Sequence, residues 1–97
     1  MRILVLGGDG YLGWPTAMDL ASKGHEVCVM DNYLRRNVAR ETCSESLMIN
    51  PNLHERVSIF QSITGKQILV EIGNCANYQR LSEVFFAFKP DTVIHYA

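Results

Sequence analysis

Residues 3–13 read Ile-Leu-Val-Leu-Gly-Gly-Asp-Gly-Tyr-Leu-Gly, an aliphatic run followed directly by a glycine-rich turn. The aliphatic run is short and uniformly apolar, which is typical of a central parallel strand covered on both faces. A helical pattern follows the turn. This order of strand, turn and helix brings main-chain N–H groups to the positive end of a helix, where a pyrophosphate can bind. The stretch therefore predicts a nucleotide-binding turn.

The glycines of this turn fit two fingerprints. Gly8, Gly10 and Gly13 form G-x-G-x-x-G, whereas Gly7, Gly10 and Gly13 form G-x-x-G-x-x-G. Both patterns also occur at purely structural turns, so the context decides between the two meanings. Asp31 follows about 20 residues later on the end of an expected second strand, where a carboxylate accepts hydrogen bonds from the adenosine ribose. The turn and Asp31 together favour nucleotide binding over a structural turn without a ligand.

The composition is that of a globular chain, with 97 residues of which 47% are hydrophobic. A formal net charge of −1 argues against broad attraction to nucleic acid or to an anionic membrane. The three cysteines, Cys28, Cys43 and Cys75, are widely spaced and include no C-x-x-C pair, which argues against a disulfide framework or a zinc site. No targeting or membrane-spanning pattern precedes the first strand, so we expect a cytoplasmic protein if Met1 is the native start.

Strand and helix patterns alternate along the whole chain. After the strand over residues 2–6, further strands are expected over residues 25–31, 67–72 and 92–97. The first helix has Pro15 in its first turn and ends at Lys23-Gly24, and the last is expected over residues 78–88 with Asn77 as its cap. Residues 33–51 are polar and only weakly helical in pattern.

A further helix is expected over residues 51–65, capped by Asn50, with Pro51 at its first position and Gly65 at its end. It carries one apolar stripe, formed by Leu53, Val57, Phe60 and Ile63. The whole order predicts an α/β fold, a three-layer Rossmann-type parallel sheet with strand order 3-2-1-4 and a ligand crevice between strands one and four. Because the chain stops on a central strand, we expect residues 1–97 to be the N-terminal NAD-binding segment of a larger domain.

Four segments at the expected strand ends occur in the order found in a known family. These are the glycine turn, Asp31-Asn32, Gly73-Asn74-Cys75 and residues 93–97, which read Val-Ile-His-Tyr-Ala. In them the chain resembles the NAD-dependent sugar-nucleotide epimerases and dehydratases, which are extended short-chain dehydrogenases/reductases. Within this family it most resembles the UDP-sulfoquinovose synthases, on account of Gly13-Trp14, Arg35-Arg36 and Ile63-Thr64-Gly65-Lys66.

The resemblance implies how NAD would be bound. The pyrophosphate would lie on Gly10, Tyr11 and Leu12, and the adenosine ribose would lie on Asp31 and Asn32. The adenine would meet the turn after the third strand, and the end of the fourth strand would pass under the pyrophosphate and the nicotinamide ribose. The candidate cofactor-binding residues are Gly7, Gly10, Tyr11, Leu12, Gly13, Asp31, Asn32, Arg35, Arg36, Asn74, Cys75, Tyr96 and Ala97.

Two features of these residues leave the details of cofactor recognition open. The carboxylate of Asp31 disfavours a 2′-phosphate and so favours NAD over NADP, whereas Arg35 and Arg36 are suited to binding a phosphate. Asn74 and Cys75 replace the usual aspartate and aliphatic residue of the family, although the carbonyl oxygen of Asn74 can still accept a hydrogen bond.

The resemblance also implies the reaction of the full protein, which would oxidise a UDP-glucose-like nucleotide sugar transiently with NAD and then return the hydride. In the UDP-sulfoquinovose synthases sulfite is the nucleophile. The catalytic Tyr-x-x-x-Lys pair of the family is absent from these residues, so we assign no catalytic residue and expect the fragment itself to be inactive. A non-catalytic NAD(P)-sensing Rossmann module is the alternative. The three histidines are too far apart to suggest a metal site, and a homodimer is one option for the assembly.

Overall fold

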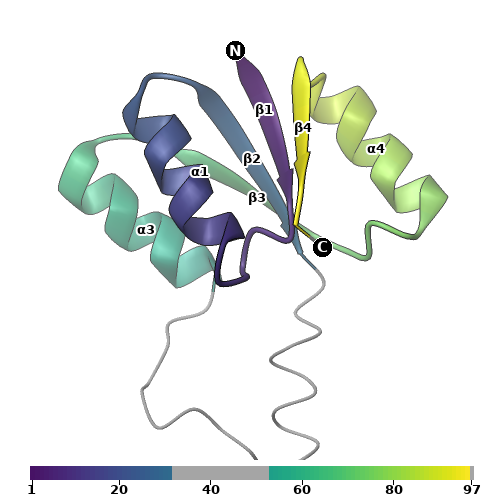
Figure 1. Ribbon diagram of the computed structural model, residues 1–97, viewed down its shortest axis with the longest axis horizontal. Coiled ribbons are helices and arrows are strands. Elements are labelled where there is room, and N and C mark those ends of the chain that lie inside the picture. The colour runs from purple at the N-terminus through teal and green to yellow at the C-terminus, as the bar shows by residue number, and fades with distance from the viewer. Residues whose placement is uncertain (32–52, 97) are drawn as a thin grey trace, which may run out of the picture.

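The computed structural model describes residues 1–31 and 53–96. Within them the chain forms a four-stranded parallel sheet in the order β3-β2-β1-β4 (Figure 1). The strands are β1 (Arg2–Leu6), β2 (Glu26–Asp31), β3 (Ile68–Ile72) and β4 (Thr92–His95). The helices are α1 (Gly13–Ser22), α3 (Leu53–Thr64) and α4 (Tyr78–Phe88). The predicted α/β fold and the strand order 3-2-1-4 are therefore confirmed.

The two central strands are apolar on both faces because helices cover both sides of the sheet. Side chains alternate between the faces of a strand, so neighbouring residues enter different layers of the core. One layer packs β1 and β2 against α1 and α3 and includes Ile3, Val5, Val27, Val29, Leu53 and Phe60. The other packs the same strands against α4 and includes Leu4, Leu6, Cys28, Met30, Val84 and Phe88. This two-sided burial explains the uniformly aliphatic run that begins the sequence.

The ends of the helices follow from local chemistry. Pro15 is the third residue of α1, where its missing N–H group removes no helical hydrogen bond. Gly65, directly after α3, has a φ of +74°, a conformation that favours glycine. The side chain of Asn77 caps α4 as predicted, because its Oδ1 accepts a hydrogen bond from the Arg80 N–H at 3.2 Å. Lys89 ends α4 in the left-handed conformation, with a φ of +55°.

Two expectations need correction, and two others lie outside the described residues. The sequence pattern places Ile63 in the apolar stripe of α3, but its side chain is 78% exposed. At 3.6 residues per turn, Phe60 lies about 20° around the helix axis from Leu53. Ile63 lies about 80° from Leu53 and is therefore outside the buried face of the helix. The fourth strand ends at His95, two residues earlier than expected. The weakly helical segment 33–51 and the helix start at Asn50 and Pro51 lie outside the described residues.

Candidate functional site

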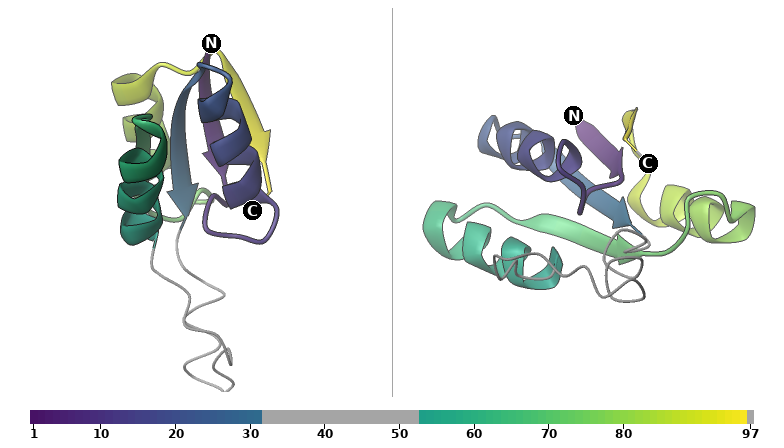
Figure 2. Two further views of the ribbon diagram at one scale, coloured as in Figure 1. Left: turned by 90° about the vertical axis from the view of Figure 1, so that its left-hand side faces the viewer. Right: turned by 60° about the horizontal axis from the view of Figure 1, so that its bottom comes forward.

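The carboxyl ends of the four strands meet at one edge of the sheet, together with the glycine turn between β1 and α1. Figure 2 shows this arrangement of the strand ends and the turn from two further directions. Main-chain hydrogen bonds join the strand ends, and the Gly7 N–H donates to the Met30 carbonyl at 2.8 Å. The Gly73 N–H donates to the Asp31 carbonyl at 3.0 Å, and the Tyr96 N–H donates to the Leu6 carbonyl at 2.8 Å. The fold therefore brings the described candidate residues from all four strands to one side of the molecule.

Three glycines of the turn are required by the backbone conformation or the packing of the protein itself. Gly7 has a φ of +85°, which disfavours a side chain. A Cβ on Gly8 would lie 2.3 Å from the Cβ of Val29 in β2, and a Cβ on Gly13 would lie 2.1 Å from the Gly7 carbonyl oxygen. Both distances are far inside van der Waals contact. The turn thus packs so closely on β2 and on the start of α1 that Gly8 and Gly13 cannot be replaced by a residue with a side chain.

Gly10 is different, because the packing of the described residues leaves room for a Cβ at this position. Among those residues, a Cβ at Gly10 would have one neighbour within 4 Å, the Gly7 carbonyl oxygen at 3.2 Å. A small local shift would accommodate it. In a dinucleotide-binding turn, the middle glycine of the fingerprint lets the main chain approach the pyrophosphate. Gly10 therefore has the surroundings expected of the glycine that faces a ligand.

The N-terminus of α1 has main-chain donors that can bind an anion. Leu12 occupies the cap position and supplies no side-chain hydrogen bond, and the first turn holds no acidic residue. Within the part of the chain that the structure describes, the N–H groups of Tyr11 and Leu12 donate no hydrogen bond. Both residues are exposed. The first N–H groups of a helix carry partial positive charge, so this end of α1 can hold a phosphate group.

Asp31 is tied to the glycine turn. Its Oδ2 accepts a hydrogen bond from the Asp9 N–H at 3.0 Å. The side chain of Asp9 is 6% exposed, and its Oδ1 lies 3.9 Å from Nη1 of Arg56 in α3. Asp9 and Arg56 were not identified from the sequence. The position of Asp9 between two glycines of the turn was a signal that could have identified it, whereas nothing local to Arg56 indicated that it lies next to the turn.

Asn74 and Cys75 form a tight turn after β3. The Asn74 Oδ1 accepts a hydrogen bond from the Ala76 N–H at 2.9 Å, and the Asn74 carbonyl accepts one from the Asn77 N–H at 2.9 Å. A carbonyl oxygen has two lone pairs, so Oδ1 keeps the capacity to accept a second hydrogen bond. Cys75 packs against the core layer beneath α4. The turn is thus held by its own polar groups at the edge where the strand ends meet.

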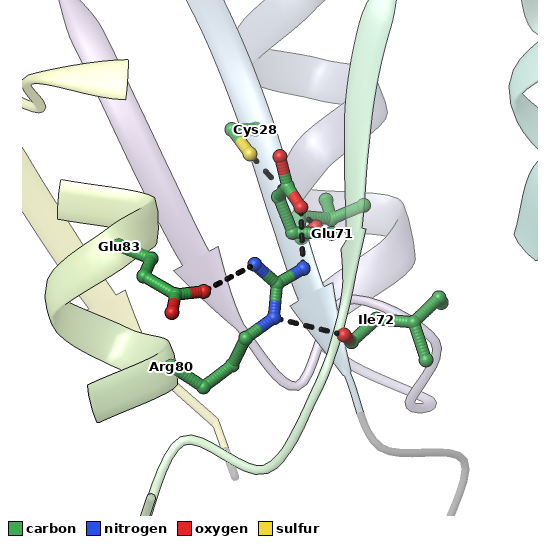
Figure 3. Close-up of polar contacts among 6 residues, drawn as sticks. Cys28, Glu71, Ile72, Arg80 and Glu83 are labelled. Atoms are coloured by element: carbon green, nitrogen blue, oxygen red, sulfur yellow. Dashed lines mark hydrogen bonds and ion pairs between the residues drawn. The ribbon is translucent and has the colours of Figure 1, made fainter. Parts of the chain in front are cut away.

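Arg80 of α4 holds the end of β3 in place (Figure 3). Its guanidinium donates to Glu71 Oε2 at 2.6 Å, to the Ile72 carbonyl at 3.2 Å and to Glu83 Oε2 at 3.5 Å. The hydrogen bond to Glu71 raises the pKa of Arg80, so the guanidinium stays charged. A Cβ on Gly73 would lie 2.7 Å from Cγ of Arg80. The Arg80 side chain therefore fills the space beside Gly73, immediately before the Asn74 turn.

Cys28 lies on β2 near this cluster (Figure 3). Burial, followed by the nearby Glu71 carboxylate, raises the pKa of its thiol to about 12. The thiol is therefore neutral at physiological pH and has the character of a buried apolar group.

Tyr96 lies next to the first turn of α1. Its hydroxyl is 3.5 Å from Oγ1 of Thr16, which donates a hydrogen bond to the Leu12 carbonyl at 2.8 Å. Thr16 was not identified from the sequence as a neighbour of the site. The contact places the residue after β4 beside the N-terminal end of α1, as the topological switch between β1 and β4 requires.

Four candidate residues, Asn32, Arg35, Arg36 and Ala97, lie outside the described residues, so their roles stay predictions. Residues 1–31 and 53–96 contain no group of three or more side chains suited to binding a metal ion. None of the helices in those ranges combines the length and the apolar character that crossing a membrane would demand. The expected cytoplasmic location stays a prediction.

Comparison with known proteins identifies relatives over the whole chain. Residues 3–97 match the family model described as the NAD dependent epimerase/dehydratase family. The UDP-sulfoquinovose synthase of Sulfolobus acidocaldarius is 42% identical over 97 residues, which are 100% of this chain and 25% of that protein. The chloroplastic UDP-sulfoquinovose synthase of Spinacia oleracea is 39% identical over 95 residues, which are 98% of this chain and 20% of that protein.

Solved structures support the same relationship. The UDP-glucose 4-epimerase of Bifidobacterium longum, solved in complex with NAD+ and UDP, superposes with a TM-score of 0.75 at 27% sequence identity. The match covers 100% of this chain and 24% of that one. The present chain thus spans about a fifth to a quarter of the length of these relatives.

Proposed function

The chain belongs to the NAD dependent epimerase/dehydratase family, and from this premise we propose that it is the dinucleotide-binding part of an NAD-dependent enzyme that modifies a nucleotide sugar. The observation that carries the proposal is the uncapped N-terminus of α1, which lies beside Gly10 and is joined to Asp31 through the Asp9 N–H. This combination provides donors for a diphosphate at the turn and a carboxylate for a ribose at the neighbouring end of β2.

The main chain binds the pyrophosphate in this proposal. The N–H groups of Tyr11 and Leu12 donate to its oxygens, and Gly10 allows it to come close. The glycines Gly7 and Gly13 shape the turn through their backbone conformation and close packing. Because these donors lie at the positive end of a helix, they favour a doubly charged diphosphate over a neutral group.

The remaining candidate residues bind the two ends of the dinucleotide. Asp31, with Asn32 after it, accepts hydrogen bonds from the hydroxyls of the adenosine ribose. The Asn74 turn lies at the adenine, with Cys75 contributing main-chain groups. Tyr96 lies under the diphosphate and the nicotinamide ribose. In this proposal Arg35, Arg36 and Ala97 make the remaining contacts to the cofactor.

Asp31 also selects the cofactor. A 2′-phosphate at the adenosine ribose would meet the carboxylate at close range, and two negative charges at such a distance repel strongly in a partly buried site. NAD is therefore bound in preference to NADP.

For the full protein we propose a reaction like that of the UDP-sulfoquinovose synthases, with UDP-glucose and sulfite as substrates. The support is the identity of about two residues in five to two such enzymes. No tyrosine of the chain has a lysine four residues later, so the catalytic Tyr-x-x-x-Lys pair of the family is not supplied by these 97 residues. The segment contributes cofactor binding and has no activity of its own.

Isothermal titration calorimetry of the full-length protein, freed of bound nucleotide, tests the cofactor assignment. We expect binding of one NAD per chain and at least tenfold weaker binding of NADP. Asp31→Ala should weaken NAD binding at least tenfold, because a hydrogen bond to a charged group is lost. Asp19→Ala is the matched control, since Asp19 is an exposed carboxylate on α1 paired with Lys23. Tighter binding of NADP than of NAD, or an Asp31→Ala variant with unchanged affinity, would overturn the proposal.

A further inference from the structure

Asp9, in the middle of the glycine turn, connects two parts of the molecule. Its main-chain N–H donates to Asp31 Oδ2 at 3.0 Å, and its side-chain Oδ1 lies 3.9 Å from Nη1 of Arg56. The two contacts use different groups of Asp9, the main-chain N–H for Asp31 and the side-chain carboxylate for Arg56. Arg56, Asp9 and Asp31 therefore form a continuous link from α3 to the end of β2.

Burial strengthens the contact between Asp9 and Arg56. The side chain of Asp9 is 6% exposed and that of Arg56 is 20% exposed. A carboxylate removed from water is costly unless a charged or hydrogen-bonding partner faces it, and solvent screens such a pair less than it screens a surface pair. The guanidinium of Arg56 therefore constrains where the Asp9 side chain, and with it the turn, can lie.

The helix that carries Arg56 is itself fixed in the core. Leu53 and Phe60, which flank Arg56 on α3, are 0% and 7% exposed. The rings of Phe60 and Trp14 pack edge to face with centroids 6.5 Å apart, which joins α3 to α1. Arg56 thus approaches the turn from a rigid element. A charge anchored in this way can hold its partner in one position.

We propose that Arg56 is a positioning residue for recognition of the adenosine ribose. It holds Asp9, and Asp9 in turn holds one oxygen of Asp31, so that the Asp31 carboxylate meets the ribose hydroxyls in one orientation. Arg56 acts through Asp9 and does not touch the nucleotide. This inference rests on the proposed binding of NAD, and it adds a residue of α3 to a site otherwise built from strand ends, the glycine turn and the N-terminus of α1.

The test measures discrimination between NAD and its 2′-deoxyadenosine analogue in the full-length protein, freed of bound nucleotide. The readout is the ratio of the two dissociation constants. In the wild type we expect a ratio of about ten or more, because the analogue lacks a hydroxyl that binds a charged carboxylate. Asp31→Ala gives the lower limit, a ratio near one. A destabilised fold would weaken both ligands alike and leave the ratio unchanged.

Arg56→Gln should lower the ratio to about three or less, and Arg56→Lys should restore part of it because the positive charge returns. Lys23→Gln is the matched control, since Lys23 forms an exposed ion pair with Asp19 on α1 and should keep the wild-type ratio. Asp9→Asn keeps the main-chain donor but removes the charge that faces Arg56, so it should lower the ratio as well. This variant tests the inference even if Arg56→Gln does not fold.

Three outcomes have distinct meanings. A wild-type protein that does not bind NAD would refute the proposed function. A wild type that discriminates, together with Arg56→Gln and Asp9→Asn variants that keep its full ratio, would refute the positioning role and leave the proposed function intact. If Arg56→Gln weakened NADP far more than NAD, Arg56 would contact the 2′-phosphate directly, and the positioning role would again be wrong.

Discussion

Replacing Gly10 with alanine should abolish tight NAD binding while leaving the fold intact. The new Cβ would meet the Gly7 carbonyl oxygen at 3.2 Å, a contact that a shift of the turn by a few tenths of an ångström relieves. Alanine also reduces the entropy of the unfolded chain, so the free energy of unfolding should change by no more than about 1 kcal/mol.

The effect on binding should be much larger. The methyl group would stand where the diphosphate approaches the N–H groups of Tyr11 and Leu12. Each hydrogen bond to a charged group contributes about 1.5–3 kcal/mol. Losing the equivalent of one or two of them corresponds to about 100-fold weaker binding. Titration calorimetry with NAD measures this loss, and urea unfolding followed by circular dichroism measures the stability of the same sample.

Gly8→Ala is the matched control, because it adds the same methyl group to the same turn. Its Cβ would lie 2.3 Å from the Cβ of Val29, which is fully buried. Overpacking of this kind should lower the free energy of unfolding by about 1–3 kcal/mol. A Gly10→Ala protein that binds NAD as tightly as the wild type would refute the proposed path of the diphosphate. If Gly10→Ala destabilised the fold as strongly as Gly8→Ala, the distinction between packing and ligand-facing glycines would be wrong.

Three further predictions concern the fold. Asn77→Ala should lower the free energy of unfolding by about 1 kcal/mol in urea titrations, because the cap of α4 is lost, and Asn77→Asp should preserve it. Lys89→Gly should raise the unfolding free energy by about 1 kcal/mol in the same assay, because glycine adopts a φ of +55° without strain; a decrease would contradict this. Since the Cys28 thiol has its pKa raised from 9.0 to about 12, its contribution to stability is full below pH 9 and declines as the pH rises toward 12. Unfolding measured between pH 8 and 11 should show a steeper decline than in Cys28→Ala, and equal slopes would refute the assignment.

Much of the fold could be predicted from the sequence because its determinants are local or periodic. The two-sided burial of residues 3–6 in β1 follows from a run of four aliphatic residues with no polar position. The cap at Asn77 is a local hydrogen bond between residues close in sequence. The strand order follows from the alternation of strands and helices together with the glycine turn. None of these predictions needs knowledge of contacts between distant residues.

The contacts between distant residues could not be predicted in this way. Arg56 approaches Asp9 only after α3 has packed beside α1, and nothing in its neighbours along the chain indicates that contact. Arg80 reaches Glu71 because α4 lies over the sheet. Ile63 fits a spacing of three and four residues, but the accumulated rotation of the helix turns it away from the core. The spacing between neighbouring apolar residues therefore does not predict that Ile63 is exposed.

The most direct test of the central claim is a crystal structure of the full-length protein with NAD bound. The account predicts diphosphate oxygens within about 2.7–3.2 Å of the main-chain nitrogens of Tyr11 and Leu12, with the adenosine ribose hydroxyls on the Asp31 carboxylate. A diphosphate bound away from the N-terminus of α1, or a turn between β1 and α1 closed by packed side chains, would contradict it.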